Sequence, residues 1–208
     1  LPPITPVLTQ YLRLRGVCSG CGHKHHAALP TGVPNGQLGT RALARVGTLS
    51  GQFHLTQGKI QRLLEQVMGL KFSIGTISMA HGHVAQALAE PVQQLQMHLS
   101  QEPVRHAEET SHKNHNHMMW AWTQVCDWGA HCAERVLRGF VIKRKLSFFT
   151  RSGRGLRFLE RIFSTVQTCA LQGRQTFGFL QAAIDSWLAG KTAPSLVPDH
   201  VLARQACA

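Results

Sequence analysis

Two groups of residues in this 208-residue chain have types and spacings that suit metal chemistry, and the first is acidic. Glu108 and Glu109 end a predicted strand that begins at Val104, and Glu134 follows on a predicted helix. Carboxylates bind Mg²⁺ through oxygen, and two such ions about 3.5–4 Å apart activate water and stabilise the leaving oxygen in phosphodiester cleavage. The simpler alternative is a solvated hairpin end, with a surface i,i+4 pair between Glu134 and Arg138.

The second group is Cys18-Ser-Gly-Cys21, which is followed at once by glycine and histidine. Two thiolates at this spacing can both reach one zinc ion at about 2.3 Å. Tetrahedral zinc needs four ligands, and closure of the site by the next histidines would crowd it: His23, His25 and His26. The sequence therefore predicts a partial structural zinc site on Cys18 and Cys21. A further histidine group, in residues 111–117, is explained by an exposed polar turn.

Charge sets the class of partner. The chain has 22 Lys+Arg against 10 Asp+Glu, a formal net charge of +12 and a pI near 10.2. A protein this basic usually has a polyanionic partner, and nucleic acid is the first choice, with a basic structural protein as the alternative. No apolar run approaches the roughly 20 residues of a membrane span. Six scattered cysteines indicate a reducing compartment, so we expect a cytoplasmic protein.

Composition divides the chain into four segments. Residues 1–40 are rich in Pro, Gly and His and predict a small Cys/His module dominated by loops. Residues 41–99 are helical in pattern and form a candidate DNA-binding segment. Residues 100–198 contain two predicted strands, at 104–107 and 118–125, and then helices between 127 and 190. Residues 199–208 are a tail.

The helical segment predicts a helix-turn-helix arrangement. A first helix covers residues 41–49, and a second runs over 57–68 between the N-cap Thr56 and the terminating Gly69. Ser73 caps a third helix, which is kinked or divided at Pro91. Ser73 and Thr76 at its start suit phosphate contacts through exposed backbone N–H groups.

A second DNA-contacting surface is predicted from the cations that follow the strands. They lie among phenylalanines, an arrangement that favours a phosphate-tracking face over an aromatic interior. The predicted contacts are Arg135, Arg138, Lys143, Arg144, Lys145 and Arg154.

Four segments in order resemble one family, the IS66-type bacterial insertion-sequence transposases. Together they cover nearly the whole chain and are specific as a set. The matching segments are Tyr11–Pro34 with its Cys-x-x-Cys-Gly, Leu49–Ser78, Glu108-Glu109-Thr110 with Trp120-Ala-Trp122, and Ala133–Pro198 with its Ala-Glu-Arg-Val-Leu-Arg start.

The resemblance implies a ribonuclease-H-like catalytic domain whose Asp-Asp-Glu triad binds Mg²⁺ and cuts and joins transposon ends. Glu108 stands at the first triad position, where the family has Asp, and Glu134 matches the final Glu. The longer side chain of Glu108 displaces a bound metal, and a misplacement of about 1 Å can lower the rate about a hundredfold.

The second Asp of the triad has no counterpart, because the family's long stretch between the tryptophan strand and the final Glu is shortened to residues 123–132. Asp127 lies roughly two helical turns before Glu134, and we do not expect it to take the place of the missing second Asp. We therefore predict an α+β, predominantly helical chain with a helix-turn-helix-like N-terminal half and a remnant of a ribonuclease-H-like domain.

The predicted function is that of a transposase-derived DNA-binding protein with impaired catalysis. The alternatives are an active transposase that uses Glu108 and Glu134 and a basic structural protein. The expected ligands are Mg²⁺ at the two glutamates and Zn²⁺ at Cys18 and Cys21. The expected partners are DNA and further copies of the chain.

Overall fold

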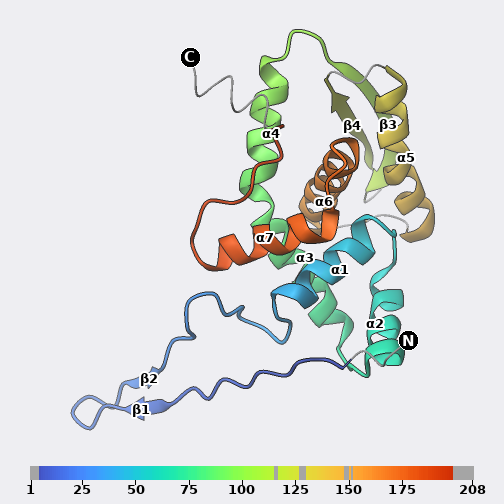
Figure 1. Ribbon diagram of the computed structural model, residues 1–208. Coiled ribbons are helices and arrows are strands. Elements are labelled where there is room, and N and C mark those ends of the chain that lie inside the picture. Colours follow the sequence, from blue (N-terminus) through green and yellow to red (C-terminus); the bar gives the residue numbers. More distant parts are fainter. Residues whose placement is uncertain (1–4, 115–116, 127–129, 148–149, 151, 199–208) are drawn as a thin grey trace.

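The computed structural model describes residues 5–114, 117–126, 130–147, 150 and 152–198. Within them the chain is mainly helical, with two small antiparallel sheets, which confirms the predicted α+β class (Figure 1). The elements are β1 (Arg15–Val17), β2 (Lys24–His26), α1 (Thr40–Gly51), α2 (Gln57–Met68), α3 (Ile74–Ala87), α4 (Ala89–Gln101), β3 (His106–Asn114), β4 (His117–Val125), α5 (Ala130–Ser147), α6 (Gly153–Leu171) and α7 (Thr176–Leu188).

Local signals fix the ends of α2 as predicted. The Thr56 hydroxyl accepts a hydrogen bond from the backbone N–H of Lys59, which caps the first turn. Gly69 ends the helix in the left-handed conformation, at φ 66°, and its N–H reaches back to the carbonyl of Glu65. A side chain at this φ would be strained, which explains why glycine terminates the helix.

The division between α3 and α4 lies at Leu88, three residues before the proline expected to mark it. Pro91 sits instead in the first turn of α4. Proline is tolerated there because the N–H groups of a first turn have no intrahelical acceptor in any case. Of the two alternatives left open at Pro91, a kink or a division, the structure has the division, and it lies three residues earlier than expected.

One hydrophobic core joins helices from both halves of the chain. α1 and α3 pack against α6 and α7, which cross them near the centre of Figure 1. Residues on both sides of the expected boundary at 99/100 therefore share one apolar interior, and its burial stabilises them together. Its largest fully buried side chains include Leu43, Ile77, Leu88, Ile162, Leu180, Ile184 and Leu196.

A smaller unit is formed by β3, β4 and α5. The two strands pair in the register His106↔Val125, and α5 packs across both of them. Its own core is small and consists of Val125, Cys132 and Ala133, with Val136 and Leu171 against them. The strands are longer than predicted. β3 continues to Asn114, so the prediction of a turn that begins at residue 111 was wrong for residues 111–114.

The longer strand has a physical cause. A polar stretch can still pair in a ladder, because the ladder uses backbone groups, and here the packing of α5 supports it. The Arg144 guanidinium of α5 donates to the Thr110 hydroxyl and to the carbonyl of Ser111, and the His112 ring is buried. Polar composition alone therefore indicated a turn where tertiary contacts extend the strand.

The N-terminal segment is dominated by loops, as predicted, and holds the short β1–β2 hairpin away from the helices (Figure 1). Every residue of its two strands is exposed. Among the described residues no helix is long and apolar enough to cross a membrane.

Candidate nucleic-acid interface and acidic residues

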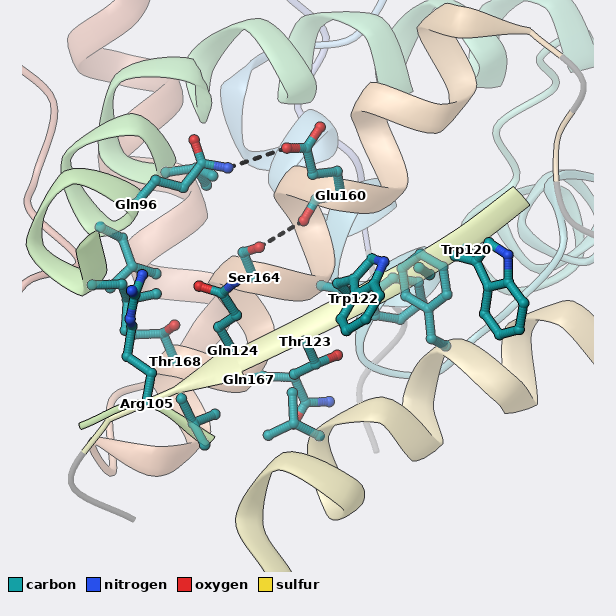
Figure 2. A pocket seen from close by; sticks show the side chains of 18 of the residues that line it. Gln96, Arg105, Trp120, Trp122, Thr123, Gln124, Glu160, Ser164, Gln167 and Thr168 are labelled. Carbon is teal, nitrogen blue, oxygen red and sulfur yellow. Dashed lines mark hydrogen bonds between the residues drawn. The ribbon is translucent and has the colours of Figure 1, made fainter. Parts of the chain in front are cut away.

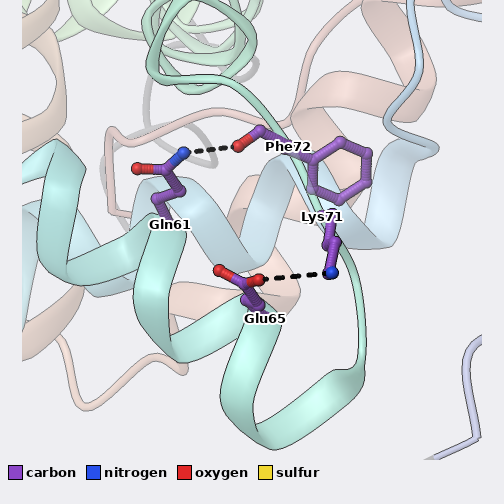
Figure 3. Close-up of polar contacts among 4 residues, drawn as sticks. All are labelled: Gln61, Glu65, Lys71 and Phe72. Carbon is purple, nitrogen blue, oxygen red and sulfur yellow. Dashed lines mark hydrogen bonds and ion pairs between the residues drawn. The ribbon is translucent and has the colours of Figure 1, made fainter.

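The loop between α2 and α3 is held by two polar contacts that position the start of α3 (Figure 3). Gln61 Nε2 donates to the backbone oxygen of Phe72 at 2.7 Å. Lys71 Nζ lies 3.9 Å from Glu65 Oε1, an exposed ion pair that contributes little. The hydrogen bond to Phe72 is therefore the contact that fixes the residue before Ser73.

Ser73 and Thr76 lie together at the N-terminus of α3, as predicted. The Ser73 hydroxyl accepts the backbone N–H of Thr76 at 3.1 Å, and the two hydroxyl oxygens are also 3.1 Å apart. Thr76 Oγ1 lies 3.4 Å from Gln37 Oε1. The Ser73 hydroxyl is thus engaged in capping and the Thr76 hydroxyl is hydrogen-bonded to its neighbours, so the first-turn N–H groups of the exposed residues Ile74 and Gly75 are the groups of this turn best placed to meet an anion.

Arg154 joins this surface from α6. Its Nη2 atom donates to the Ser78 hydroxyl on α3 at 2.9 Å, and the side chain remains exposed. The contact places a fixed positive charge within about one turn of Thr76 along the helix. The structure therefore brings three of the predicted contact residues to one region: Ser73, Thr76 and Arg154.

The cations of α5 divide between its two sides. Arg135, Arg138 and Lys145 are exposed, and none of them forms an ion pair within the part of the chain that the structure describes. The i,i+4 pair considered for Glu134 and Arg138 is accordingly not formed there. These three side chains make a second exposed basic surface.

Lys143 and Arg144 point inward. Only 6% of Lys143 is exposed, and its Nζ donates to the Leu55 carbonyl at 2.8 Å and lies 3.5 Å from Ser50 Oγ. Burial lowers the pKa of Lys143 to about 8. Consecutive helical residues are about 100° apart, so a run of three cations cannot share one face. We therefore define the candidate DNA surface without Lys143 and Arg144.

Sequence patterns gave no sign of a buried histidine beside this lysine. The His81 ring stacks on Phe158, with centroids 4.0 Å apart and planes 6° apart, and Gln57 Nε2 lies 3.4 Å from its Nδ1 atom. Burial lowers the pKa of His81 to about 3, with smaller contributions from the charges of Lys143 and Arg154. The ring is therefore neutral at physiological pH and adds no charge to the candidate DNA surface.

The two predicted catalytic glutamates lie on adjacent elements, β3 and α5, and both are exposed. Alternation along β3 puts Glu108 on the same face as Thr110, which accepts from Arg144 of α5. Among the described residues no three His, Cys, Asp or Glu side chains gather closely enough to hold a metal ion. The described carboxylates therefore do not fit a two-metal site, and Asp127 lies outside the described residues.

Cys18 and Cys21 lie in the loop of the β1–β2 hairpin. The N–H of Cys18 donates to the carbonyl of His23, and the N–H of Gly22 donates to the carbonyl of Cys18, both at 2.9 Å. Hydrogen bonds from the backbone of Cys21 and of Gly20, and then from the Cys21 side chain, lower the pKa of the Cys18 thiol. This loop favours thiolate, the form that binds zinc, and exposes it to further ligands.

The fold and these sites describe a basic, mainly helical protein with a candidate DNA-binding turn and one strand, β3, that carries two carboxylates. The family model described as "Transposase IS66 family" matches residues 35–132, from the loop before α1 to the beginning of α5. The match covers slightly less than half of the chain; it supports the resemblance to this transposase family that the sequence motifs indicated and suggests a transposition-related function. Comparisons with curated proteins and with solved structures give no match.

Proposed function

We propose that the protein binds DNA as part of transposition, through the start of α3 with Arg154 and through the exposed cations of α5. Three observations support the proposal: the match to a transposase family over residues 35–132, a net charge of +12, and cations that no described carboxylate neutralises. The last observation carries it. Exposed cations without internal partners can release the counterions of a DNA backbone, which is the main source of affinity in such complexes.

The test is binding of duplex DNA that carries the insertion-sequence ends, measured by fluorescence anisotropy over a range of salt concentrations. Arg138→Ala and Arg154→Ala are each expected to weaken binding and to reduce the slope of log K against log salt by about 1. Lys191→Ala, which removes an exposed cation beyond α7, is the matched control. Binding with a flat salt dependence, or equal losses for all three variants, would contradict the proposed surface.

Ser73→Ala is a less direct test. The Ser73 hydroxyl caps α3, and loss of an N-cap destabilises a helix by about 0.5–2 kcal/mol. The stability of that variant must therefore be measured before any loss of DNA affinity is assigned to a missing contact.

We further propose that DNA cutting is impaired. Support comes from the longer Glu108 side chain at the first triad position and from the lack of a third metal-binding side chain beside Glu108 and Glu134 among the described residues. The test is nicking of the same DNA with Mg²⁺ or Mn²⁺, with Glu134→Gln as the comparison. Retarded migration without nicking is the expected result. Nicking that Glu134→Gln abolishes would favour the alternative, an active transposase.

Zinc is proposed for the N-terminal hairpin. Cys18 and Cys21 would supply two thiolate ligands, and the rest of the coordination must come from other groups. In this role the metal would stabilise the hairpin, whose strands have no buried residue of their own.

A further inference from the structure

A groove lies between the outer face of β4 and the helices α4 and α6 (Figure 2). Its volume is about 560 Å³, within the usual range for ligand sites of roughly 300–1,000 Å³. The predicted DNA contacts do not include any residue that lines it. Val136 and Phe140 of α5 line the groove, but the exposed cations of α5 and the start of α3 do not.

Two tryptophans dominate one wall of the groove. Trp120 and Trp122 are two residues apart on β4, so they project from the same face of the strand, together with Gln124 (Figure 2). Their exposed fractions are 55% and 64%, and neither ring stacks on another ring within the described residues. Two large, flat, solvent-facing π surfaces side by side can stack planar ligands.

Positive charge and hydrogen-bonding groups line the remainder of the groove. Arg105 and Arg157 are exposed, and neither guanidinium has an ion pair or a hydrogen bond within the described part of the chain. The Glu160 carboxylate accepts from Gln96 Nε2 at 3.2 Å and is thereby partly satisfied. Amide and hydroxyl groups that can meet the edges of a base come from Gln124, Ser164, Gln167 and Thr168.

We propose that this groove binds a short single-stranded nucleic-acid segment, with bases stacked on Trp120 and Trp122 and phosphates directed to Arg105 and Arg157. The faces of bases become available to aromatic rings when the bases are unpaired, which is why the ligand is single-stranded. Glu109 pairs with Trp122 across the strands, and its carboxylate repels phosphate from that edge. This proposal rests on the proposed DNA-binding function and adds single-stranded nucleic acid to duplex DNA as a ligand of the protein.

Charge distinguishes this ligand from a second copy of the chain. An apolar wall with exposed tryptophans could also be covered by another protein molecule. A second copy would bring a further +12 against a groove that already holds two unpaired arginines. A polyanion neutralises those charges, whereas self-association adds to them.

The experiment measures binding of a fluorescent oligothymidine to the full chain and, in parallel, binding of the duplex transposon end. Trp120→Leu and Trp122→Leu keep an apolar side chain and remove the ring. Each is expected to weaken oligothymidine binding roughly 5- to 150-fold, the range for loss of one base–aromatic stack, and to leave duplex affinity within about twofold. Met118→Leu, an exposed apolar change on the same face of β4, is the matched control and should alter neither affinity.

Arg105→Ala and Arg157→Ala test the phosphate contacts. Each should reduce the salt slope of oligothymidine binding by about 0.7, the value for one contact with a single strand. Unchanged oligothymidine binding in both tryptophan variants, with duplex binding intact, overturns this proposal and leaves the proposed function standing. If the unaltered chain binds neither the oligothymidine nor the duplex, both this proposal and the proposed function are refuted. A dimer that Trp122→Leu dissociates would assign the face to self-association and overturn the proposal.

Discussion

His81 gives the sharpest prediction about stability. It is buried against Phe158, and within the described residues its Nε2 atom has no hydrogen-bond partner. The ring also faces the positive charges of Lys143 and Arg154, while Gln57 approaches its other nitrogen. Protonation would therefore place a new charge in an apolar interior beside two existing ones. The folded state resists that protonation and the unfolded state does not.

The size of the effect follows from linkage. The pKa of His81 is about 3 in the folded state, against an ordinary value of 6.5 for the unfolded chain. As pH falls below 6.5, the unfolded state binds a proton that the folded state excludes, so stability is lost. Between pH 7 and pH 5 the loss from this one group is about 2 kcal/mol, at 1.36 kcal/mol per pH unit. The melting temperature should fall by about 4–8 °C.

The assay is urea unfolding of the reduced protein at pH 7 and at pH 5, for the unaltered chain and for His81→Phe. The phenyl ring preserves the stack, and Gln57, which loses its contact with Nδ1, is only partly buried and can bond to water instead, so the substitution should cost little at pH 7. We expect the pH-dependent loss of stability to shrink by about 2 kcal/mol in the variant. A smaller loss should remain, because burial also lowers the pKa values of His54 and His112. His25→Phe, in the exposed hairpin, is the control.

An equal pH-dependent loss in His81→Phe and the unaltered chain would refute the reasoning. If the variant does not fold, an NMR titration of the ring in the unaltered chain gives an independent answer. A His81 ring that takes up a proton near pH 6 in the folded protein would also refute the reasoning, because its surroundings would then not oppose protonation.

Three further predictions concern packing and metal binding. Gly51→Ala places a Cβ atom 2.5 Å from Ile162 Cγ1, and overpacking of this kind should destabilise the fold by about 1–3 kcal/mol in thermal unfolding. In the control, Gly58→Ala, the new Cβ meets open space, and the fold should be stabilised by up to about 1 kcal/mol. Leu180→Ala opens a cavity in the central core and should lower the free energy of unfolding by about 2–5 kcal/mol. Cys18→Ser should abolish the protection of hairpin thiols by Zn²⁺ against a thiol reagent.

Each of these has a matched comparison. Val67→Ala truncates an exposed aliphatic side chain of α2 and should alter stability by less than about 0.5 kcal/mol in the experiment with Leu180. Ser19→Ala changes the same hairpin loop without removing a thiol and should keep zinc protection. Similar losses at the core and surface positions, or equal zinc protection in both hairpin variants, would count against the packing and metal-binding arguments.

Local signals predicted much of the helical structure. Capping residues fixed both ends of α2 and the start of α3, because a cap acts through its own neighbours in sequence. The buried side of α5 could not be predicted in this way. The acceptor of Lys143 is the carbonyl of Leu55, 88 residues earlier in the chain, and no local pattern encodes that meeting. His81 escaped prediction for the same reason, since Phe158 lies on a distant helix.

The candidate site was predicted unevenly. The start of α3 and the exposed cations of α5 followed from helix-capping signals and charge. The groove beside β4 did not, because its walls come from α4, β4, α5 and α6, with His112 of β3, and only the tertiary fold brings these elements together. Trp120 and Trp122 were recognised as family motif residues, yet their exposure depends on what fails to pack over them.

The way α1 and α3 meet α6 and α7 has a consequence for the history of the chain. The helices that flank the β3–β4–α5 unit, α4 and α6, both pack into the central core, and α5 is fixed to that core by Phe140 and by the hydrogen bond from Lys143 to Leu55. The length of the connections within this peripheral unit can change while the central core stays intact, just as insertions at surface sites are tolerated in other proteins. A transposase gene that lost codons there would still encode a product able to fold.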